Sequence, residues 1–277
     1  MALETFCFVL LAAALHATWN AVVKNGGHKL FSTILVTSTA AMLAMLLIPF
    51  QPLPAMASWP FIVASTVLQV GYYLLVARIY HVADMSQTYP LMRGTAPLLV
   101  ALIGSIVLKE TLPLIAWLGI AVLCFGILSL AWAGRSTAGQ GVRLAFFNAL
   151  VIAAYTLVDG MGVRRSGHPL AYTLWIFCLS GIPLLIWVSV RRRQAFRQYM
   201  TGNWWFGLIG GVGTITSYGI ALWAMTVAPI AVISALRETS ILFGMVISAV
   251  VLKERVDRAR IVAACLIVGG AAALRLA

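Results

Sequence analysis

Long apolar stretches separated by short polar loops follow one another along the whole chain. Each stretch is close to twenty residues long, which is the length a helix needs to cross the hydrocarbon core of a bilayer. The stretches are continuous and lack the alternation over about ten residues that marks a membrane β-barrel strand. The pattern predicts an all-α integral membrane protein with ten transmembrane helices, over residues 3–23, 30–50, 59–81, 85–108, 112–133, 141–162, 170–190, 204–226, 230–252 and 257–275.

An internal repeat relates the two halves of the chain. Residues 91–112, LMRGTAPLLVALIGSIVLKETL, align without gaps with residues 235–256, ALRETSILFGMVISAVVLKERV. The alignment superimposes two VLKE tetrapeptides and pairs Arg93 with Arg237. Apolar residues match easily by chance, but a matched tetrapeptide together with a matched intramembrane arginine does not.

The same register extends further and defines the organisation of the chain. Gly126 is paired with Gly270, and each half contains five predicted spans. Because five is an odd number, the second half enters the membrane from the opposite side. We therefore predict two inverted five-helix repeats, residues 1–134 and 141–277. Many secondary transporters have this plan, with the binding site near the midplane where the repeats meet.

The two paired arginines are the strongest candidates for a functional site. Arg93 lies eight residues into its span, about 12 Å from one face at 1.5 Å per residue. Arg237 lies at a similar depth from the other face of a hydrocarbon core about 30 Å thick. A lipid-facing arginine near the bilayer centre costs at least roughly 2.5–3.5 kcal/mol, so both side chains are expected to face one interior cavity. Two interpretations stay open: the arginines bind substrate, or they form ion pairs with Asp159 and Glu238 that lock helices together.

Further polar and aromatic side chains at similar depth are candidates for the lining of this cavity. Tyr89 precedes Arg93 by four residues and shares its helix face. The proposed substrate-binding residues are Arg93, Arg237, Tyr89, His16, Trp19, Asn20, Tyr155, Trp175 and Tyr218. For each aromatic residue, ordinary packing is the competing interpretation. Asp159 and Glu238 are candidates for a charge partner, a site for a substrate amine or a coupling-ion site.

The chemistry of these residues favours a ligand that carries negative charge. The guanidinium fork of arginine suits a carboxylate or a phosphate, and the aromatic rings suit an organic body. This combination predicts a small anionic or zwitterionic metabolite, such as an amino acid or a related carboxylated or phosphorylated compound. The sequence has no nucleotide-binding loop, so an ion gradient or the substrate's own gradient would drive transport. Proton antiport through Asp159, Glu238 or His16 stays open.

Composition excludes several other classes. The chain is 62% hydrophobic and 9% charged, whereas soluble domains carry about 25% charged residues. The formal net charge of +12 would suit a nucleic-acid partner, but the cations lie in short loops between spans, where they act as topology signals.

The four cysteines lie within apolar runs without CxxC spacing, so we expect no disulfide, metal site or cofactor. The sequence contains no HExxH, paired catalytic aspartates or GxSxG, so we expect no enzyme; a facilitative channel or a non-transporting membrane subunit is the alternative to a carrier.

The chain resembles the drug/metabolite transporter superfamily, and within it the EamA-like ten-helix branch. The resemblance covers nearly the whole chain, and its more specific parts are YPLMRGTAP (89–97) and LRETSILFGMVISAVVLKER (236–255). It implies a bacterial inner-membrane carrier, often an exporter of amino acids or other metabolites, that works by alternating access. It also implies a cavity lined by both halves, near spans 1, 3, 4, 6, 8 and 9. The turns at Glu110 and Glu254 belong to the family signature, and we interpret them as structural ends of helices.

The distribution of cations predicts the orientation in the membrane. If the loops are numbered from the N-terminus, four cations lie on the side of the even loops: Lys109, Arg164, Arg165 and Arg275. Thirteen lie on the side of the odd loops: Lys24, Lys29, Arg78, Arg135, Arg143, Arg191, Arg192, Arg193, Arg197, Lys253, Arg255, Arg258 and Arg260. The positive-inside rule then places the odd loops in the cytoplasm and both termini in the periplasm.

Overall fold

The fold is a bundle of membrane-spanning helices. The structure, a computed structural model, describes residues 1–24, 28–132, 139–250, 253 and 257–277, and every regular element in these ranges is helical. The elements are α1 (Leu3–Lys24), α2 (Lys29–Leu47), η1 (Ile48–Phe50), η2 (Met56–Ser58), α3 (Trp59–Val82), α4 (Met85–Val107), α5 (Leu114–Trp132), α6 (Gly139–Ser166), α7 (Pro169–Arg191), α8 (Arg193–Val227), α9 (Ile230–Arg237), α10 (Ser240–Val250) and α11 (Arg258–Leu276). This part of the chain contains ten spans long and apolar enough to cross a membrane, which confirms the predicted number. Helices α9 and α10 together form the ninth span.

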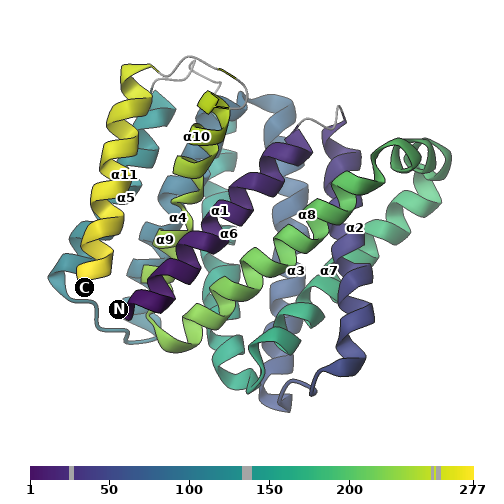
Figure 1. Cartoon of the computed structure of the whole chain (residues 1–277), viewed down its shortest axis with the longest axis horizontal. Coiled ribbons are helices and arrows are strands. Elements are labelled where there is room, and N and C mark those ends of the chain that lie inside the picture. Colours follow the sequence, from purple (N-terminus) through teal and green to yellow (C-terminus); the bar gives the residue numbers. More distant parts are fainter. Residues whose placement is uncertain (25–27, 133–138, 251–252, 254–256) are drawn as a thin grey trace.

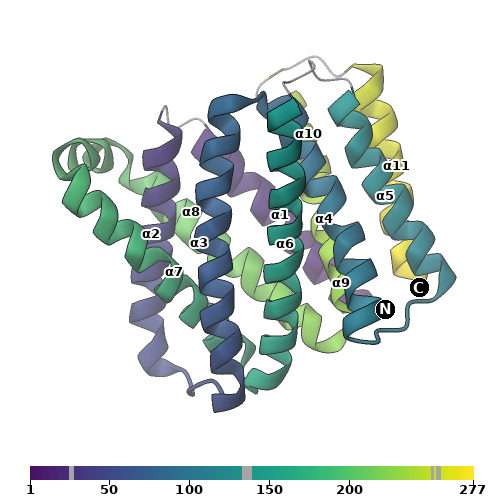
Figure 2. The same cartoon turned by 180° about the vertical axis from the view of Figure 1, so that it is seen from behind.

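The two repeats are interleaved rather than side by side. Helices α1, α8, α9 and α10 lie on the face seen in Figure 1, and α3, α4 and α6 lie on the opposite face, seen in Figure 2. Helix α3 packs on α6 as α8 packs on α1, and α4 packs on α6 as α10 packs on α1. Helices α5 and α11 pair at one end of the bundle, and α2 and α7 pair at the other. Each contact is therefore matched by one in which the repeats exchange roles, as the predicted inverted repeats require.

Equivalent glycines of the two repeats lie at the contact between α5 and α11. A Cβ atom at Gly126 would lie 2.8 Å from the Cβ atom of Leu266, and one at Gly270 would lie 2.7 Å from the carbonyl oxygen of Gly119. Both glycines thus allow the two helix backbones to approach closely. Gly126 and Gly270, which the sequence repeat pairs, therefore have the same role on the two sides of the contact between α5 and α11.

The lysines of the two VLKE tetrapeptides share an unusual backbone conformation. Lys109 and Lys253 have φ angles of 54° and 52°, in the left-handed region that side chains other than glycine rarely adopt. At the first of these turns, the amide N–H groups of Leu108 and Glu110 both donate to the carbonyl oxygen of Gly104. The left-handed residue ends α4 and turns the chain toward α5, so the structural role expected for the turn at Glu110 is present. Glu254 lies outside the described residues.

Replacing Lys109 with glycine is expected to stabilise the protein. The left-handed conformation costs an L-residue about 1–2 kcal/mol, and the added flexibility of glycine in the unfolded chain offsets roughly half of the gain. We expect Lys109→Gly to raise the thermal unfolding midpoint in detergent by a few degrees. Lys109→Ala is the matched control, because alanine keeps the Cβ atom and should give no increase. Equal midpoints for the two variants would contradict this explanation.

The eighth span differs from the sequence prediction in its starting point. Helix α8 begins at Arg193 and has 35 residues, whereas hydropathy predicts a start at residue 204. At 1.5 Å per residue the helix is about 52 Å long, well beyond the roughly 30 Å of the hydrocarbon core. Hydropathy missed the first turns because they are polar. These turns are held by packing, since Phe196 is buried against Phe31 of α2.

The ninth span is broken in the middle, which the sequence pattern did not predict. Helix α9 ends at Arg237, helix α10 begins at Ser240, and Glu238 and Thr239 form a turn between them. The amide N–H of Thr239 donates to the carbonyl oxygen of Leu236, which is the spacing of a tight turn rather than of an α-helix. Helix α4, the equivalent span of the first repeat, stays helical from Met85 to Val107. Discontinuous helices of this kind often form binding sites in transporters.

Candidate functional site

A cavity of about 130 Å³ lies between the two repeats. Pockets for drug-sized ligands measure about 300–1,000 Å³, so in this conformation the cavity suits a small solute. Helices α1, α3, α4, α6, α7, α8 and α9 contribute to it. The lining residues are His16, Trp19, Asn20, Gln69, Tyr72, Tyr73, Tyr89, Arg93, Tyr155, Phe177, Thr214, Ser217, Tyr218 and Arg237. Both arginines of the sequence repeat therefore reach one cavity.

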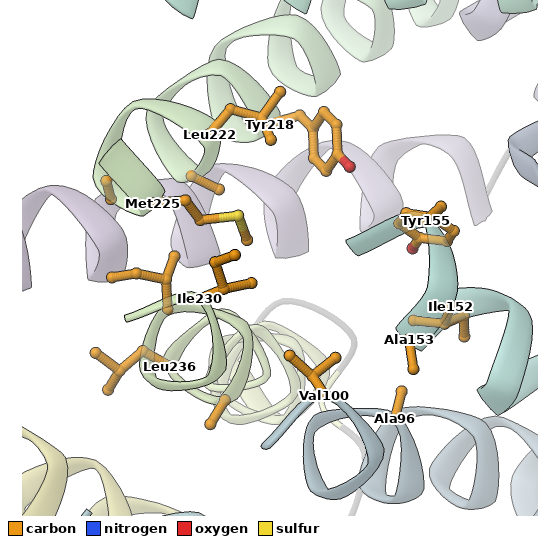
Figure 3. Packing of buried hydrophobic residues seen from close by; sticks show 14 of the residues in the cluster. Ala96, Val100, Ile152, Ala153, Tyr155, Tyr218, Leu222, Met225, Ile230 and Leu236 are labelled. Carbon is orange, nitrogen blue, oxygen red and sulfur yellow. The ribbon is translucent and has the colours of Figure 1, made fainter. Parts of the chain in front are cut away.

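One wall of the cavity is continuous with the apolar core. Figure 3 shows Tyr155 and Tyr218 at the edge of a cluster of buried side chains from α4, α6, α8 and α9. Val100 of α4 and Ile230 of α9 are fully buried in this cluster. The core thus packs against the two tyrosines and joins helices of both repeats next to the cavity.

Arg93 is neutralised within the protein. Its Nε atom lies 2.8 Å from Oε2 of Glu238, and the two side chains are 8% and 6% exposed. Neither of these two atoms has a hydrogen-bond partner, so the contact is a charge pair with poor hydrogen-bond alignment. The pair joins α4 of the first repeat to the break between α9 and α10. For Arg93 the structure supports the helix-locking interpretation, and Glu238 is its charge partner.

Arg237 is in a different situation, although the repeat makes it equivalent to Arg93. Its guanidinium carbon lies 4.8 Å from the ring centre of Tyr218, a cation–π contact. Neither ion pair found in the described part of the chain includes Arg237. Arg237 is the last residue of α9 and Glu238 follows in the turn, so the break allows one residue to face the cavity and the next to meet Arg93. Arg237 is therefore a cation of the cavity lining that is in neither ion pair of the described residues.

Asp159 lies behind the cavity rather than in its lining. Its carboxylate is fully buried and accepts hydrogen bonds from the hydroxyl of Tyr172 at 3.2 Å, from Nε2 of Gln69 at 3.4 Å and from the hydroxyl of Tyr218. Gln69 and Tyr218 line the cavity, and Arg237 stacks on the ring of Tyr218. Asp159 therefore touches the cavity only through these two side chains, which differs from the sequence expectation of a carboxylate open to a substrate amine or an ion.

Eight of the nine residues proposed to bind substrate line the cavity, and Trp175 is the exception. Trp175 does not line the described cavity; its ring packs edge-on against Trp59 with centroids 4.9 Å apart. Its place in α7 turns it toward the start of α3, so the expectation that it contacts substrate is not retained. On α1, the ring of His16 meets that of Trp19 at 5.2 Å, and Nδ2 of Asn20 donates to the carbonyl oxygen of His16. These three residues form the α1 side of the cavity.

Sequence reasoning missed six lining residues: Gln69, Tyr72, Tyr73, Phe177, Thr214 and Ser217. A signal for some of them exists in the sequence. Gln69 and Tyr72 are three residues apart on α3, and Thr214, Ser217 and Tyr218 follow the spacing of one face of α8. Such polar positions on one face of an apolar span usually point into the bundle. Phe177 has no such signal, because it is one apolar residue in an apolar helix.

Comparison with known families agrees with this architecture. The model of the EamA-like transporter family matches residues 4–132 and matches again over residues 139–276. The chain belongs to the EamA-like transporter family. The comparison with curated proteins gave no match. One solved protein crystal structure resembles this EamA-like chain with a TM-score of 0.72 at 17% sequence identity, covering 99% of this chain and 96% of the other. At that identity the likeness concerns the fold alone.

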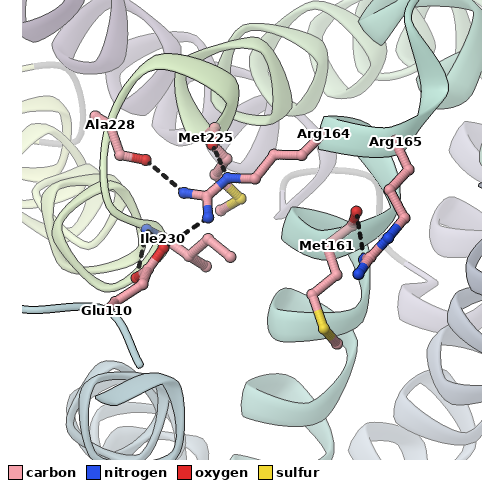
Figure 4. Close-up of polar contacts among 7 residues, drawn as sticks. All are labelled: Glu110, Met161, Arg164, Arg165, Met225, Ala228 and Ile230. Carbon is pink, nitrogen blue, oxygen red and sulfur yellow. Dashed lines mark hydrogen bonds and ion pairs between the residues drawn. The ribbon is translucent and has the colours of Figure 1, made fainter. Parts of the chain in front are cut away.

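A second polar cluster lies on the even-loop side of the EamA-like bundle (Figure 4). Nη1 of Arg164 lies 2.8 Å from Oε1 of Glu110, and the same guanidinium donates to the carbonyl oxygens of Met225 and Ala228 at the end of α8. The Glu110 carboxylate also accepts the amide N–H of Ile230, the first residue of α9. Glu110 belongs to the first repeat and the other residues to the second. The cluster therefore ties the repeats together between the cavity and the side of the termini.

Breaking this cluster is expected to open the even-loop side. In a variant whose native cysteines are replaced by alanine, a cysteine introduced at Ala231, which is 1% exposed, should react slowly with a membrane-impermeant maleimide. We expect Arg164→Ala and Glu110→Ala each to raise its labelling rate severalfold, and the double variant to add little, because both substitutions remove one network.

Arg165→Ala is the matched control for this labelling experiment. Arg165 neighbours Arg164 but points away from the cluster, donating to the carbonyl oxygen of Met161 in its own helix (Figure 4). Its removal should leave the labelling rate unchanged. If Arg165→Ala and Arg164→Ala increased labelling equally, the cluster would not be what closes this side.

Proposed function

We propose that this protein is a secondary active transporter, acting as an exporter, for a small zwitterionic or anionic metabolite such as an amino acid. Membership of the EamA-like transporter family supports the general activity. The choice of ligand rests on one observation: Arg237 lines a cavity rich in aromatic side chains and has no ion-pair partner among the described residues. An arginine in this situation is suited to bind a carboxylate through two parallel hydrogen bonds.

The balance of charges around the cavity favours a zwitterion over a simple anion. Arg93 and Arg237 are balanced in formal charge by Glu238 and Asp159, all within the bundle. In a medium of low dielectric constant, an added net charge is expensive unless it is paired. An amino acid brings a carboxylate for Arg237 and an ammonium of opposite charge, so it leaves the balance unchanged.

Two amides in the lining provide acceptors for such an ammonium. The NH₂ group of Asn20 is used on the carbonyl oxygen of His16, and that of Gln69 is used on Ser65 and Asp159. The amide oxygen of each residue is then the group that remains for a ligand, and an amide oxygen accepts hydrogen bonds. The rings of Tyr72, Tyr155 and the other aromatic residues suit the organic body of the metabolite.

The position of the closed side fits one state of an alternating-access cycle. Tyr89 is in the second turn of α4 from its odd-loop end, and Asn20 is four residues from the odd-loop end of α1. The cavity thus extends from the middle of the bundle toward the odd loops, while the Glu110–Arg164 cluster lies on the even side. With the odd loops in the cytoplasm of a bacterial inner-membrane protein, this state would receive substrate from the cytoplasm. Release would require the Glu110–Arg164 cluster to open, driven by an ion gradient, in which protons are the first candidate, or by the substrate gradient.

The decisive experiment is a ligand screen followed by a transport assay. Purified protein is tested by thermal shift against amino acids, organic acids, phosphonates and opine-like chelators, and the best ligand is then compared with its ester and with its analogue lacking the amine. We expect both changes to weaken binding. Equal affinity of acid and ester would remove the role proposed for Arg237.

Proteoliposomes separate a carrier from the alternatives. A carrier saturates with substrate and shows counterflow when the vesicles are preloaded. Uptake that is linear in concentration and lacks counterflow would indicate a facilitative channel, and no uptake of any ligand that binds would indicate a non-transporting subunit.

A further inference from the structure

Four arginines gather at the corner between α7 and α8, away from the cavity. Arg191 is the last residue of α7, Arg192 connects the helices, and Arg193 and Arg197 lie in the first turns of α8. All four are exposed. This corner forms the right-hand tip of the molecule in Figure 1. We propose that these arginines form a binding site for the headgroups of anionic phospholipids, such as phosphatidylglycerol, in the leaflet on the odd-loop side.

The corner is held in a fixed position by the rest of the fold. Phe196, between Arg193 and Arg197, is 6% exposed and packs with Ile34 and Leu35 of α2 in a small cluster separate from the main core. One turn later the hydroxyl of Tyr199 lies 2.6 Å from Oγ of Ser32. These contacts explain why α8 extends beyond its apolar part. They also hold the segment that carries the arginines against α2.

These charges are not neutralised by an ion pair within the part of the chain that the structure describes. Neither ion pair of the described chain involves any of the four arginines, and the sequence contains no acidic residue between Asp159 and Glu238. Arg193 and Arg197 are four residues apart on one helix face, a spacing at which like charges destabilise a helix. Since no described residue pairs with this group, we expect its counter-charge to come from outside the chain.

The depth of the corner in the membrane identifies the source of that counter-charge. Trp204 and Trp205 follow on α8 and are 62% and 41% exposed, as expected for tryptophans at the interface between hydrocarbon and water. Arg197 precedes Trp204 by seven residues, about 10 Å along the helix. We therefore place the arginines on the water side of these tryptophans, in the region of the lipid phosphates. Clusters of four or more basic residues next to a span bind anionic lipid, and arginine binds phosphate through its fork.

The test compares lipid binding by native mass spectrometry of the full-length protein in detergent. The protein is titrated with dioleoylphosphatidylglycerol and, separately, with dioleoylphosphatidylcholine. We expect phosphatidylglycerol to be retained at least tenfold better by the wild type. The quadruple variant Arg191→Gln, Arg192→Gln, Arg193→Gln and Arg197→Gln should lose most of this preference.

The chain offers a control with the same loss of charge on the same side of the membrane. A second quadruple variant replaces Arg78, Arg143, Lys253 and Arg258 with glutamine, and it should keep the preference for phosphatidylglycerol. A further variant, Phe196→Ala, keeps every charge but releases the corner from α2, and it should weaken retention severalfold. If the first quadruple variant fails to insert into the membrane, the test is the retention of phosphatidylglycerol by Phe196→Ala compared with that by the wild type.

Three results would overturn the proposal. The first is equal retention of phosphatidylglycerol by the wild type and the corner variants. The second is equal loss in the control quadruple variant, which would indicate a response to net charge alone. The third is displacement of the lipid by millimolar inorganic phosphate, which would indicate a site for a soluble anion.

Discussion

Arg237→Ala is expected to abolish high-affinity binding while leaving the protein folded. The loss of a charge-assisted hydrogen-bonding group is worth about 1.5–3 kcal/mol, which corresponds to a roughly 10- to 150-fold weaker affinity. Because Arg237 takes part in neither ion pair of the described residues and contacts the ring of Tyr218, we expect a small change in the thermal unfolding midpoint. The measurements are the dissociation constant of the best ligand from the thermal-shift panel and the unfolding midpoint in its absence.

Two further variants make the Arg237 experiment specific. Arg237→Lys keeps the charge but loses the fork that matches a carboxylate, so its affinity should lie between those of the wild type and Arg237→Ala. Arg165→Ala removes an arginine that faces away from the cavity and should bind as the wild type does. If Arg237→Ala binds normally, the anion in the ligand is recognised elsewhere or is absent.

Arg93→Ala and Glu238→Ala are each expected to destabilise the protein strongly. Either substitution leaves one buried charge without its partner, and the typical cost is about 3–5 kcal/mol. At roughly 2–4 °C per kcal/mol for a protein of this size class, the unfolding midpoint should fall on the order of ten degrees. Circular dichroism or a thermal-shift dye in detergent measures this directly.

The double variant Arg93→Met with Glu238→Leu should recover most of the lost stability. Replacing a buried ion pair with apolar residues of similar volume is often neutral or stabilising. Its affinity for ligand should fall less than that of Arg237→Ala, since Arg93 is already neutralised by Glu238. If the double variant is as unstable as the single variants, the contact at 2.8 Å is not the interaction that matters.

These two experiments separate residues that the sequence repeat makes equivalent. From sequence, Arg93 and Arg237 have the same role, and two cations argue for an anionic ligand. In the structure one cation is matched by Glu238, and the net charge around the cavity is zero. Our proposal of a zwitterionic ligand, with Arg237 rather than Arg93 as the residue that binds its carboxylate, follows from that difference.

Hydropathy and the repeat by themselves determined the architecture of this protein. The number of spans follows from the length of each apolar run, a local property that later folding does not change. The inversion follows from five spans in each half, and the convergence of Arg93 and Arg237 on one cavity follows from inversion together with the cost of facing lipid.

Only the tertiary structure decided which polar group meets which. On an ideal helix Glu238 would point about 100° away from Arg237, and the sequence offered Glu238 and Asp159 as candidate partners without deciding which arginine each would meet. In the structure Glu238 lies in the turn that follows Arg237, where its carboxylate meets Arg93 of α4. For the same reason Asp159 and Trp175 were assigned to the cavity from their depth alone, whereas their direction around the helix, and the neighbours that satisfy them, depend on how separate helices pack.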